Sequence, residues 1–175
     1  INNFKDLEKA YILFNKSIII KSCEFGYDGK NQYKVNSKNL ADFKKFSLKN
    51  FIAEKVVEYK KEISVISCID KFNNVYSFPP VENEHANNIL VKTKFPALIS
   101  EEVNNKAINF SQTISKELSI IGVLAVEMFV LYNNDILINE IAPRPHNSGH
   151  WTMDGCEFSQ FDNVIFSISG QKLKK

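Results

Sequence analysis

The order of apolar and polar residues along the chain predicts helices and short strands in alternation. Apolar positions spaced three and four residues apart predict helices at 4–14, 100–119 and 158–170, the second capped by Ser100 and the third ending at Gly170. Runs rich in β-branched residues predict strands, which lie at 17–22, 33–35, 51–57, 62–70 and 74–81, with a hairpin over 122–143.

Two further segments complete the pattern. A short helix is predicted at 37–46 with Ser37 as its cap, and the polar stretch 81–97 is interpreted as an irregular surface segment. The chain is therefore expected to be α+β, with mostly antiparallel strands and helices packed against them.

Composition excludes several classes of protein. A length of 175 residues suits one domain or two small lobes. The net charge of +2 argues neither for nor against nucleic-acid binding, but the scattered lysines, which form no basic block, argue against it. Cys23, Cys68 and Cys156 are far apart and odd in number, which favours reduced thiols in a cytoplasm. No run is apolar enough for a membrane span. Because the chain opens on Ile1, we expect it to be a fragment of a longer protein.

The predicted hairpin 122–143 carries two glutamates. A loop of two or four residues around 133–134 pairs Leu131 with Ile136, and counting back from that pair places Glu127 opposite Glu140. Opposed residues share one face of a sheet, with Cβ atoms roughly 4.5–5.5 Å apart. A loop of three residues would instead put the two carboxylates on opposite faces.

Both glutamates have apolar neighbours in the sequence, so burying them without a partner would be costly. A divalent cation would remove that cost, and Mg²⁺ is the natural candidate because it binds one or two carboxylates and completes its shell with water and phosphate oxygens. The alternative is that Glu127 and Glu140 lie on a solvated face or pair with lysines.

The segment "EIAPRPHNSGH" (140–150) follows the hairpin and contains Arg144, the only arginine of the chain. Pro143 and Pro145 stiffen the backbone on either side of it. A guanidinium held there suits a phosphate or a carboxylate-like anion. More hydrogen-bonding groups follow directly, at His146, Asn147, Ser148 and His150. The alternative is an ordinary proline-rich loop.

Two more segments could bind an anionic ligand. The loop "GYDGKNQ" (26–32) is either a hairpin tip or a set of backbone amides that covers phosphates. Lys21 ends the run Ile18–Ile20, and a lysine on a buried strand usually has an anionic partner. The stretch 54–62 is either an exposed charged edge or an extended segment that binds an adenine and its ribose.

Together these motifs resemble the ATP-grasp fold, and most of all the carboxyaminoimidazole ribonucleotide synthetases of purine biosynthesis. The tail "NEIAPRPHNSGHWTMDGCEFSQF" is similar to that family over its whole length. "GYDGKNQ" resembles the family's "GYDGKGQ", with Asn31 in place of glycine. "PPVENEHANNIL" resembles "ENxHxxGIL", with Asn88 in place of glycine.

The resemblance implies a two-lobed fold of antiparallel sheets packed with helices, with ATP bound between the lobes. Residues 1–57 would form the small lobe, with the glycine loop 26–32 and a hinge at 54–57, and residues 58–175 the large lobe with the metal site. The family's amino-terminal and carboxy-terminal domains would be absent, and the full-length enzyme is expected to be a homodimer.

Roles implied by the resemblance fall into three groups. The ATP-binding residues would be Lys21, Gly26, Tyr27, Gly29, Lys30, Gln32, Glu54, Lys55, Val57 and Glu62. The metal ligands would be Glu127 and Glu140. The catalytic residues would be Arg144, His146, Asn147 and, as a hypothetical general base, Asp28.

The implied activity is that of a carbon–nitrogen ligase. Bicarbonate attacks the γ-phosphate of ATP to give carboxyphosphate, and the carbon dioxide released from it is captured by aminoimidazole ribonucleotide as a carbamate. Two alternatives remain: the formate-using glycinamide ribonucleotide transformylase, whose tail is similar only as far as "PRPH", and a nucleotide-binding fragment without turnover. We expect the isolated fragment to be inactive or weakly active.

Overall fold

A computed structural model describes residues 1–24 and 31–174 of the chain. Five predicted site residues lie outside the described residues, namely Gly26, Tyr27, Asp28, Gly29 and Lys30. The described chain divides into two compact units. The first comprises Ile1–Glu58 with Asn87–Ile89, and the second comprises Tyr59–Ala86 with Leu90–Lys175. Their assignment as a small and a large ATP-grasp lobe, divided at 57/58, stays a prediction.

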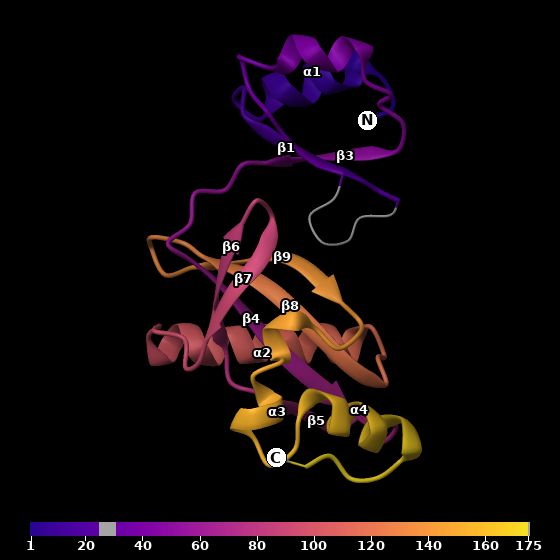
Figure 1. Cartoon of the computed structure of the whole chain (residues 1–175), viewed down its shortest axis with the longest axis vertical. Helices are drawn as coiled ribbons and strands as arrows, with labels where there is room; N and C mark the ends of the chain where they lie inside the picture. Colours follow the sequence, from indigo (N-terminus) through magenta and orange to yellow (C-terminus); the bar gives the residue numbers. More distant parts are fainter. Residues whose placement is uncertain (25–30, 175) are drawn as a thin grey trace. The chain divides into compact units, whose positions relative to one another are not determined.

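The first unit is a small sheet with a helix packed on it (Figure 1). Its elements are α1 (Phe4–Leu13), β1 (Ile18–Ser22), β2 (Gln32–Val35), the 3₁₀ helix η1 (Leu40–Lys45) and β3 (Phe51–Lys55). The strands are antiparallel in the order β2-β1-β3. Ile18 and Ile20 alternate along β1 and pack against Leu7 and Tyr11 of α1. Lys21 consequently lies on the opposite face of the sheet.

The second unit is built on a larger sheet. Its elements are β4 (Lys61–Ile69), β5 (Val75–Ser77), β6 (Val81–Ala86), β7 (Ile89–Lys94), α2 (Glu101–Glu117), β8 (Gly122–Val130), β9 (Ile136–Ala142), the 3₁₀ helix η2 (Asn147–Gly149), α3 (Thr152–Gly155) and α4 (Gln160–Ser169). The strand order is β7-β6-β4-β8-β9, with β5 also paired to β4.

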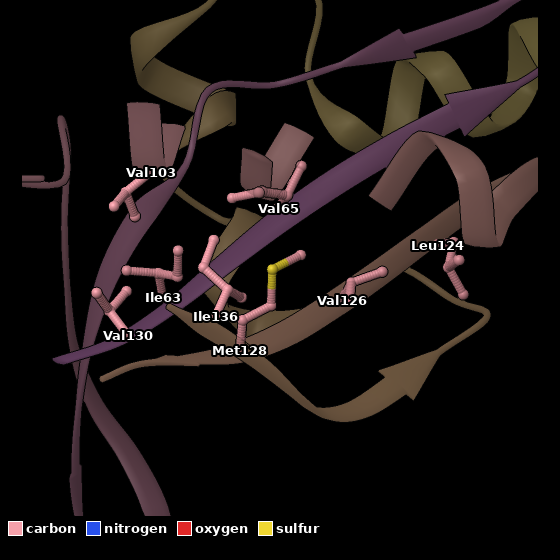
Figure 2. Packing of buried hydrophobic residues seen from close by; sticks show 9 residues of the cluster. Ile63, Val65, Val103, Leu124, Val126, Met128, Val130 and Ile136 are labelled. Atoms are coloured by element: carbon pink, nitrogen blue, oxygen red, sulfur yellow. The ribbon is translucent and has the colours of Figure 1, made fainter. Parts of the chain in front are cut away.

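One face of this sheet is mostly apolar and is covered by α2 (Figure 1). Figure 2 shows its buried side chains, among them Ile63 and Val65 from β4 and Val126 and Met128 from β8. Val103 of α2 packs against them. The α2 helix is amphipathic and begins at the predicted cap, since the Ser100 side chain accepts a hydrogen bond from the N–H of Val103.

The opposite face has two different halves. At one end Ile66, Cys68, Val123 and Ala125 pack beneath the segment that contains Trp151 and α4. Further along the same strands this face becomes mostly polar. The next pair across β4 and β8 is Ser64 and Glu127, followed by Glu62 and the aromatic Phe129. The alternation of two long strands therefore places polar groups together beside the part of the face that α4 covers.

The structure confirms the predicted α+β class and most of the predicted elements. The prediction that residues 81–97 are irregular is wrong. This segment forms the hairpin of β6 and β7, joined by Asn87 and Asn88 with φ of 51° and 63°. Two successive residues with positive φ make the tight turn that matches the twist of a hairpin, and asparagine adopts this conformation more readily than most residues. The polar strand residues concealed the hairpin because they face the site or solvent.

Three boundaries also differ from the prediction. The helix expected at 37–46 is the 3₁₀ helix η1, which begins at Leu40 without a side-chain cap, because the side chains of Asn36 and Asn39 hold residues 36–39 in a turn. The strand expected at 74–81 ends at Ser77, before the two prolines that follow. The strand expected at 51–57 ends at Lys55.

Asparagine replaces glycine of the similar motifs at two positions, and both have left-handed backbones. Asn31 has φ of 59° and Asn88 has φ of 63°. Asparagine tolerates this region because its short polar side chain can hydrogen-bond locally. The two departures are therefore compatible with the backbone that glycine would adopt there. Within residues 1–24 and 31–174, no helix combines the length and apolar character needed to cross a bilayer.

The central core gives a first prediction. Ile63 on β4 is fully buried on the face that α2 covers, so Ile63→Ala should lower the free energy of unfolding by about 2–5 kcal/mol through lost burial and the cavity left behind. Chemical denaturation would measure this. Ile165→Ala is the control, because Ile165 lies in the same unit with 55% of its surface exposed and should change stability little. Equal losses for the two variants would contradict the packing described.

Candidate functional site

Two carboxylates lie opposite each other at the polar end of the large sheet. Glu127 on β8 pairs with Glu140 on β9, and Ala125 pairs with Ala142 next to them. Since Ala125 and Ala142 belong to the buried cluster on the face away from α2, the two glutamates also project to that face. The predicted pairing of Glu127 with Glu140 is confirmed, although one step of the reasoning behind it is wrong.

The loop of the hairpin is not the one expected. Leu131 donates its N–H to the carbonyl of Asp135 at 2.8 Å, so it pairs with Asp135 and not with Ile136. The connection is thus residues 132–134, a three-residue loop that by itself would separate the glutamates. A β-bulge next to Glu127 restores the register, because Met128 pairs with Ile138 while Glu127 pairs with Glu140. Asn139 is the extra residue.

The two carboxylates differ in exposure. Glu127 has 14% of its side chain exposed, whereas Glu140 is exposed on the edge strand β9. The expectation that both are embedded among apolar groups is therefore wrong for Glu140, because its neighbours Leu137, Ile138 and Ile141 are themselves exposed. Of the two glutamates, only Glu127 would therefore pay the free-energy cost of burying a carboxylate.

The loop after β9 brings a histidine to Glu127. His146 is 9% exposed, and its Nε2 lies 3.4 Å from Oε1 of Glu127. Burial first, and then the nearby charges of Arg144 and two other histidines, lower the pKa of His146 to about 4. The ring is therefore neutral near pH 7, and it approaches Glu127 as a neutral ring and not as a cation.

The other two predicted residues of this loop are exposed. Arg144 donates from Nη1 to the carbonyl of Pro145 at 3.0 Å, and its charge acts on His146. Asn147 begins the 3₁₀ helix η2. Both residues are thus accessible to a ligand, and Arg144 and His146 lie near each other as predicted.

Glu62 belongs to a second polar group on β4. It contacts Nδ1 of His85 and accepts a hydrogen bond from the hydroxyl of Tyr59, whose ring stacks on Phe129 at 4.4 Å. Burial alone would raise the pKa of Glu62, but the hydrogen bonds from His85 and Tyr59 bring it below its usual value. The same contact raises the pKa of His85. Burial and this hydrogen bond raise the pKa of Tyr59 to about 12.

A small pocket joins these two polar groups. Its lining includes Glu62, Asn83, His85, Glu127 and Asn139, together with Ile63, Met128 and Phe129. Across the described parts of the chain, no cluster of three or more histidine, cysteine, aspartate or glutamate side chains could hold a metal. Carboxylate and amide oxygens nevertheless suit Mg²⁺, which needs few protein ligands when phosphate oxygens supply the rest.

The first unit holds the remaining predicted residues. Nζ of Lys21 lies 2.8 Å from Oε2 of Glu54, which gives that lysine the anionic partner expected of it. Gln32 pairs with Lys21 across β1 and β2. Lys55 ends β3 with its side chain exposed, and Val57 follows the strand half-buried. Three of these residues, Lys21, Gln32 and Glu54, are therefore brought together.

Sequence reasoning missed three polar residues of the site. They are Ser64, Asn83 and His85, which join hydrogen bonds around Glu62 and His146. His85 stood in a quoted motif without an assigned partner, whereas Ser148 was expected to be a hydrogen-bonding group and does bond to the His146 ring. The signal that could have found Ser64 is a hydroxyl within the otherwise apolar strand β4, where a buried polar group needs a hydrogen bond.

Comparison with known proteins identifies similar chains. The family of ATP-grasp domains matches residues 1–161. An N5-carboxyaminoimidazole ribonucleotide synthase of Staphylococcus aureus (strain COL) is 40% identical over 170 residues, which are 96% of this chain and 45% of that protein. The chain thus spans less than half the length of this curated relative.

Solved structures of similar proteins share the fold. N5-carboxyaminoimidazole synthetase from Staphylococcus aureus in complex with ADP has a TM-score of 0.92 and 38% identity over 100% of this chain and 47% of its own. N5-carboxyaminoimidazole synthase from Aspergillus clavatus, in complex with ADP and 5-aminoimidazole ribonucleotide, has a TM-score of 0.86 and 30% identity over 99% of this chain and 46% of its own.

The contact between Glu62 and His85 gives a pH-dependent prediction. Glu62 raises the pKa of His85. The contact between them therefore stabilises the folded state at low pH, where His85 is protonated, and this contribution is lost as the pH rises through the folded-state pKa of His85. Glu62→Gln should therefore lower this pKa toward the ordinary value near 6.5. An NMR titration of the histidine ring protons would measure it.

Glu82→Gln is the control for that titration. Glu82 is a neighbouring carboxylate, but it pairs with Lys61 through Oε2 at 2.5 Å, so its loss should move the pKa of His85 little. A pKa of His85 that is unchanged in Glu62→Gln would contradict the assigned contact.

Proposed function

Because the chain belongs to the ATP-grasp family, we propose that it is the nucleotide-binding core of an N5-carboxyaminoimidazole ribonucleotide synthase. The whole enzyme would use ATP and bicarbonate to convert aminoimidazole ribonucleotide into its carbamate. Identity of 40% over 96% of the chain supports this assignment. The observation that carries the chemistry is the pairing of Glu127 with Glu140, next to the loop that bears Arg144 and His146.

The paired carboxylates would hold the metal that accompanies ATP. Glu127 and Glu140 supply oxygens from adjacent strands, and the amide of Asn139 lies in the pocket with Glu127. When bound, Mg²⁺ would neutralise charge on the phosphates of ATP. Strand pairing, and not a flexible loop, sets the backbone positions of both glutamates before a ligand arrives.

Several of the predicted residues would bind the nucleotide itself. Lys21 would provide a positive charge for the phosphates, and Glu54, Lys55 and Val57 would meet the adenine, while Glu62 would accept hydrogen bonds from the ribose hydroxyls. Glu62 is suited to this role because it is ionised and held in place by His85 and Tyr59. A fixed, charged acceptor loses little freedom when it binds a hydroxyl pair.

Arg144 and His146 would act on the anions of the reaction. The planar guanidinium of Arg144 can donate two parallel hydrogen bonds to bicarbonate or to a transferred phosphoryl group. His146 is neutral near pH 7, so it can donate a hydrogen bond beside Glu127 without adding charge. Asn147 is exposed next to it and could donate to the same anion.

Two alternatives rest on particular observations. A formate-using transformylase would share the fold, but the sequence Asn147–His150 after "PRPH" favours the carboxylase. The second alternative is a chain that binds nucleotide without turnover; the match covers 45% of the curated relative. We also propose that the whole enzyme works in the cytoplasm, where Cys23, Cys68 and Cys156 would stay reduced.

Calorimetry of nucleotide binding tests the metal site. In Glu140→Gln, the strengthening of ATP binding by Mg²⁺ should be lost, and the affinity should fall by more than the roughly 10–100-fold that loss of an outer-shell partner costs a metal site. The control is Glu117→Gln, which removes an exposed carboxylate at the end of α2. Unchanged Mg²⁺ dependence in Glu140→Gln would exclude the pair as metal ligands.

A substrate comparison tests the reaction. The full-length enzyme should release phosphate from ATP with bicarbonate and aminoimidazole ribonucleotide, and should release little with formate and glycinamide ribonucleotide. The 175-residue chain should bind ATP with Mg²⁺ but show little or no turnover in the same assay. Preference for formate would replace the carboxylase with the transformylase, and full activity of the 175-residue chain would refute the expected loss of turnover.

A further inference from the structure

A row of hydrogen bonds, buried from Asn83 onward, leads from β7 to the ring of His146. The hydroxyl of Thr93 donates to Oδ1 of Asn83 at 3.1 Å, and Nδ2 of Asn83 donates to Oγ of Ser64 at 2.9 Å. Oγ of Ser64 in turn donates to Oγ of Ser148 at 2.7 Å, and Oγ of Ser148 lies 2.8 Å from Nδ1 of His146. Every link lies within the second unit.

The donors and acceptors of this row follow one another in a single direction, toward the His146 ring. Ser148 already accepts from Ser64, so its own proton is free to go to Nδ1 of His146. The backbone N–H of Ser148 also points to Nδ1, at 3.4 Å. A nitrogen approached by two donors must be the bare one, which leaves the proton of a neutral ring on Nε2.

The far side of the ring requires the same tautomer. Nε2 of His146 lies 3.4 Å from the carboxylate oxygen Oε1 of Glu127, which can only accept when it is ionised. If every donor and acceptor of the row were exchanged, Nδ1 of His146 would carry the ring proton. That N–H would then face another donor, the backbone N–H of Ser148. The lone pair of Nε2 would then face the carboxylate, so the reversed row is unfavourable at both ends.

We propose that Asn83, Ser64 and Ser148 are positioning residues that hold His146 as its Nε2–H tautomer and aim that N–H at the carboxylate of Glu127. This inference rests on the proposed function for the role of Glu127 as a metal ligand. Hydrogen bonds behind a liganding group orient it and tune its affinity for the metal. The row therefore links three strands and the loop after β9 to one oxygen of the metal site.

The backbone of His146 is held separately from its ring. Oε1 of Gln160 accepts from the N–H of His146 at 3.0 Å, and Nε2 of Gln160 donates to its carbonyl at 2.8 Å. Gln160 is fully buried and packs closely against Gly149, where an added Cβ would lie 2.5 Å from Oε1 of Gln160. Since Gln160 fixes the loop, loss of a hydroxyl in the row should disturb the ring without releasing the backbone.

Nitrogen NMR of the histidine rings tests the tautomer in the 175-residue chain without any ligand. We expect His146 to show a protonated Nε2 and a bare, hydrogen-bonded Nδ1. In Ser64→Ala, the Nδ1 resonance should move toward that of a bare nitrogen without a hydrogen bond, because Ser148 has lost the donor that orients it. Ser64→Thr keeps a hydroxyl and should restore the wild-type resonance.

Ser67→Ala is the matched control. Ser67 lies on the same strand and is equally buried, and its hydroxyl makes hydrogen bonds of 2.7 Å to Ser77 and Ser111 on the other face of the sheet. It should destabilise the fold comparably but leave the His146 resonances unchanged. Should Ser64→Ala not fold, Ser148→Ala removes the link that is adjacent to Nδ1 and should give the same displacement.

Binding of ADP with Mg²⁺ provides the second readout. Ser64→Ala should weaken it by about 10-fold or more, the range in which outer-shell partners act, and Ser67→Ala should not. A protonated Nδ1 in the wild type, or equal displacement of the resonances in Ser64→Ala and Ser67→Ala, would overturn the proposal. If the resonances behave as expected but no Mg²⁺-dependent nucleotide binding occurs, the tautomer assignment stands and the proposed metal site fails.

Discussion

The alternation of side chains along the paired strands β4 and β8 is the constraint on which the second unit depends. Each strand has nine residues, and they pair along their whole length, so every second residue must face the same side of the sheet. One side takes the apolar cluster under α2. The other carries apolar residues where α4 covers it and Ser64, Glu62 and Glu127 beyond that cover. The same two strands therefore build the core with one face and carry the site on the other.

The position of Glu140 shows how a correct prediction can contain an error. The sequence count assumed a regular ladder and the wrong loop, and a three-residue loop alone would have put Glu127 and Glu140 on opposite faces. The bulge at Asn139 adds one residue and restores the pairing. A bulge depends on the local contacts of the edge strand, so the sequence pattern does not reveal it. The loop and the bulge compensate each other.

Helices and strands with a regular pattern of apolar residues could be predicted from the sequence. Clusters of side chains that form only through tertiary contacts could not. The helix capped by Ser100 and the strand β4 follow from local spacing. The hairpin of β6 and β7 was hidden because its strands are polar, although its Asn87–Asn88 turn was a usable signal. The association of Asn83 with Ser64 and Ser148 joins strands and a loop that are distant in sequence, so no local pattern could give it.

Asparagine occupies most of the left-handed backbone positions among the described residues. Asn15, Asn31, Asn50, Asn73, Asn87, Asn88 and Asn134 all have φ between 51° and 66°. Glycine would adopt the same conformation with less steric cost, but it would also give the denatured chain more conformations to lose. At Asn31 and Asn88, where the similar motifs have glycine, this chain therefore surrenders less backbone entropy when it folds. Turns without glycine thereby favour the native state, because they lower the conformational entropy of the unfolded chain.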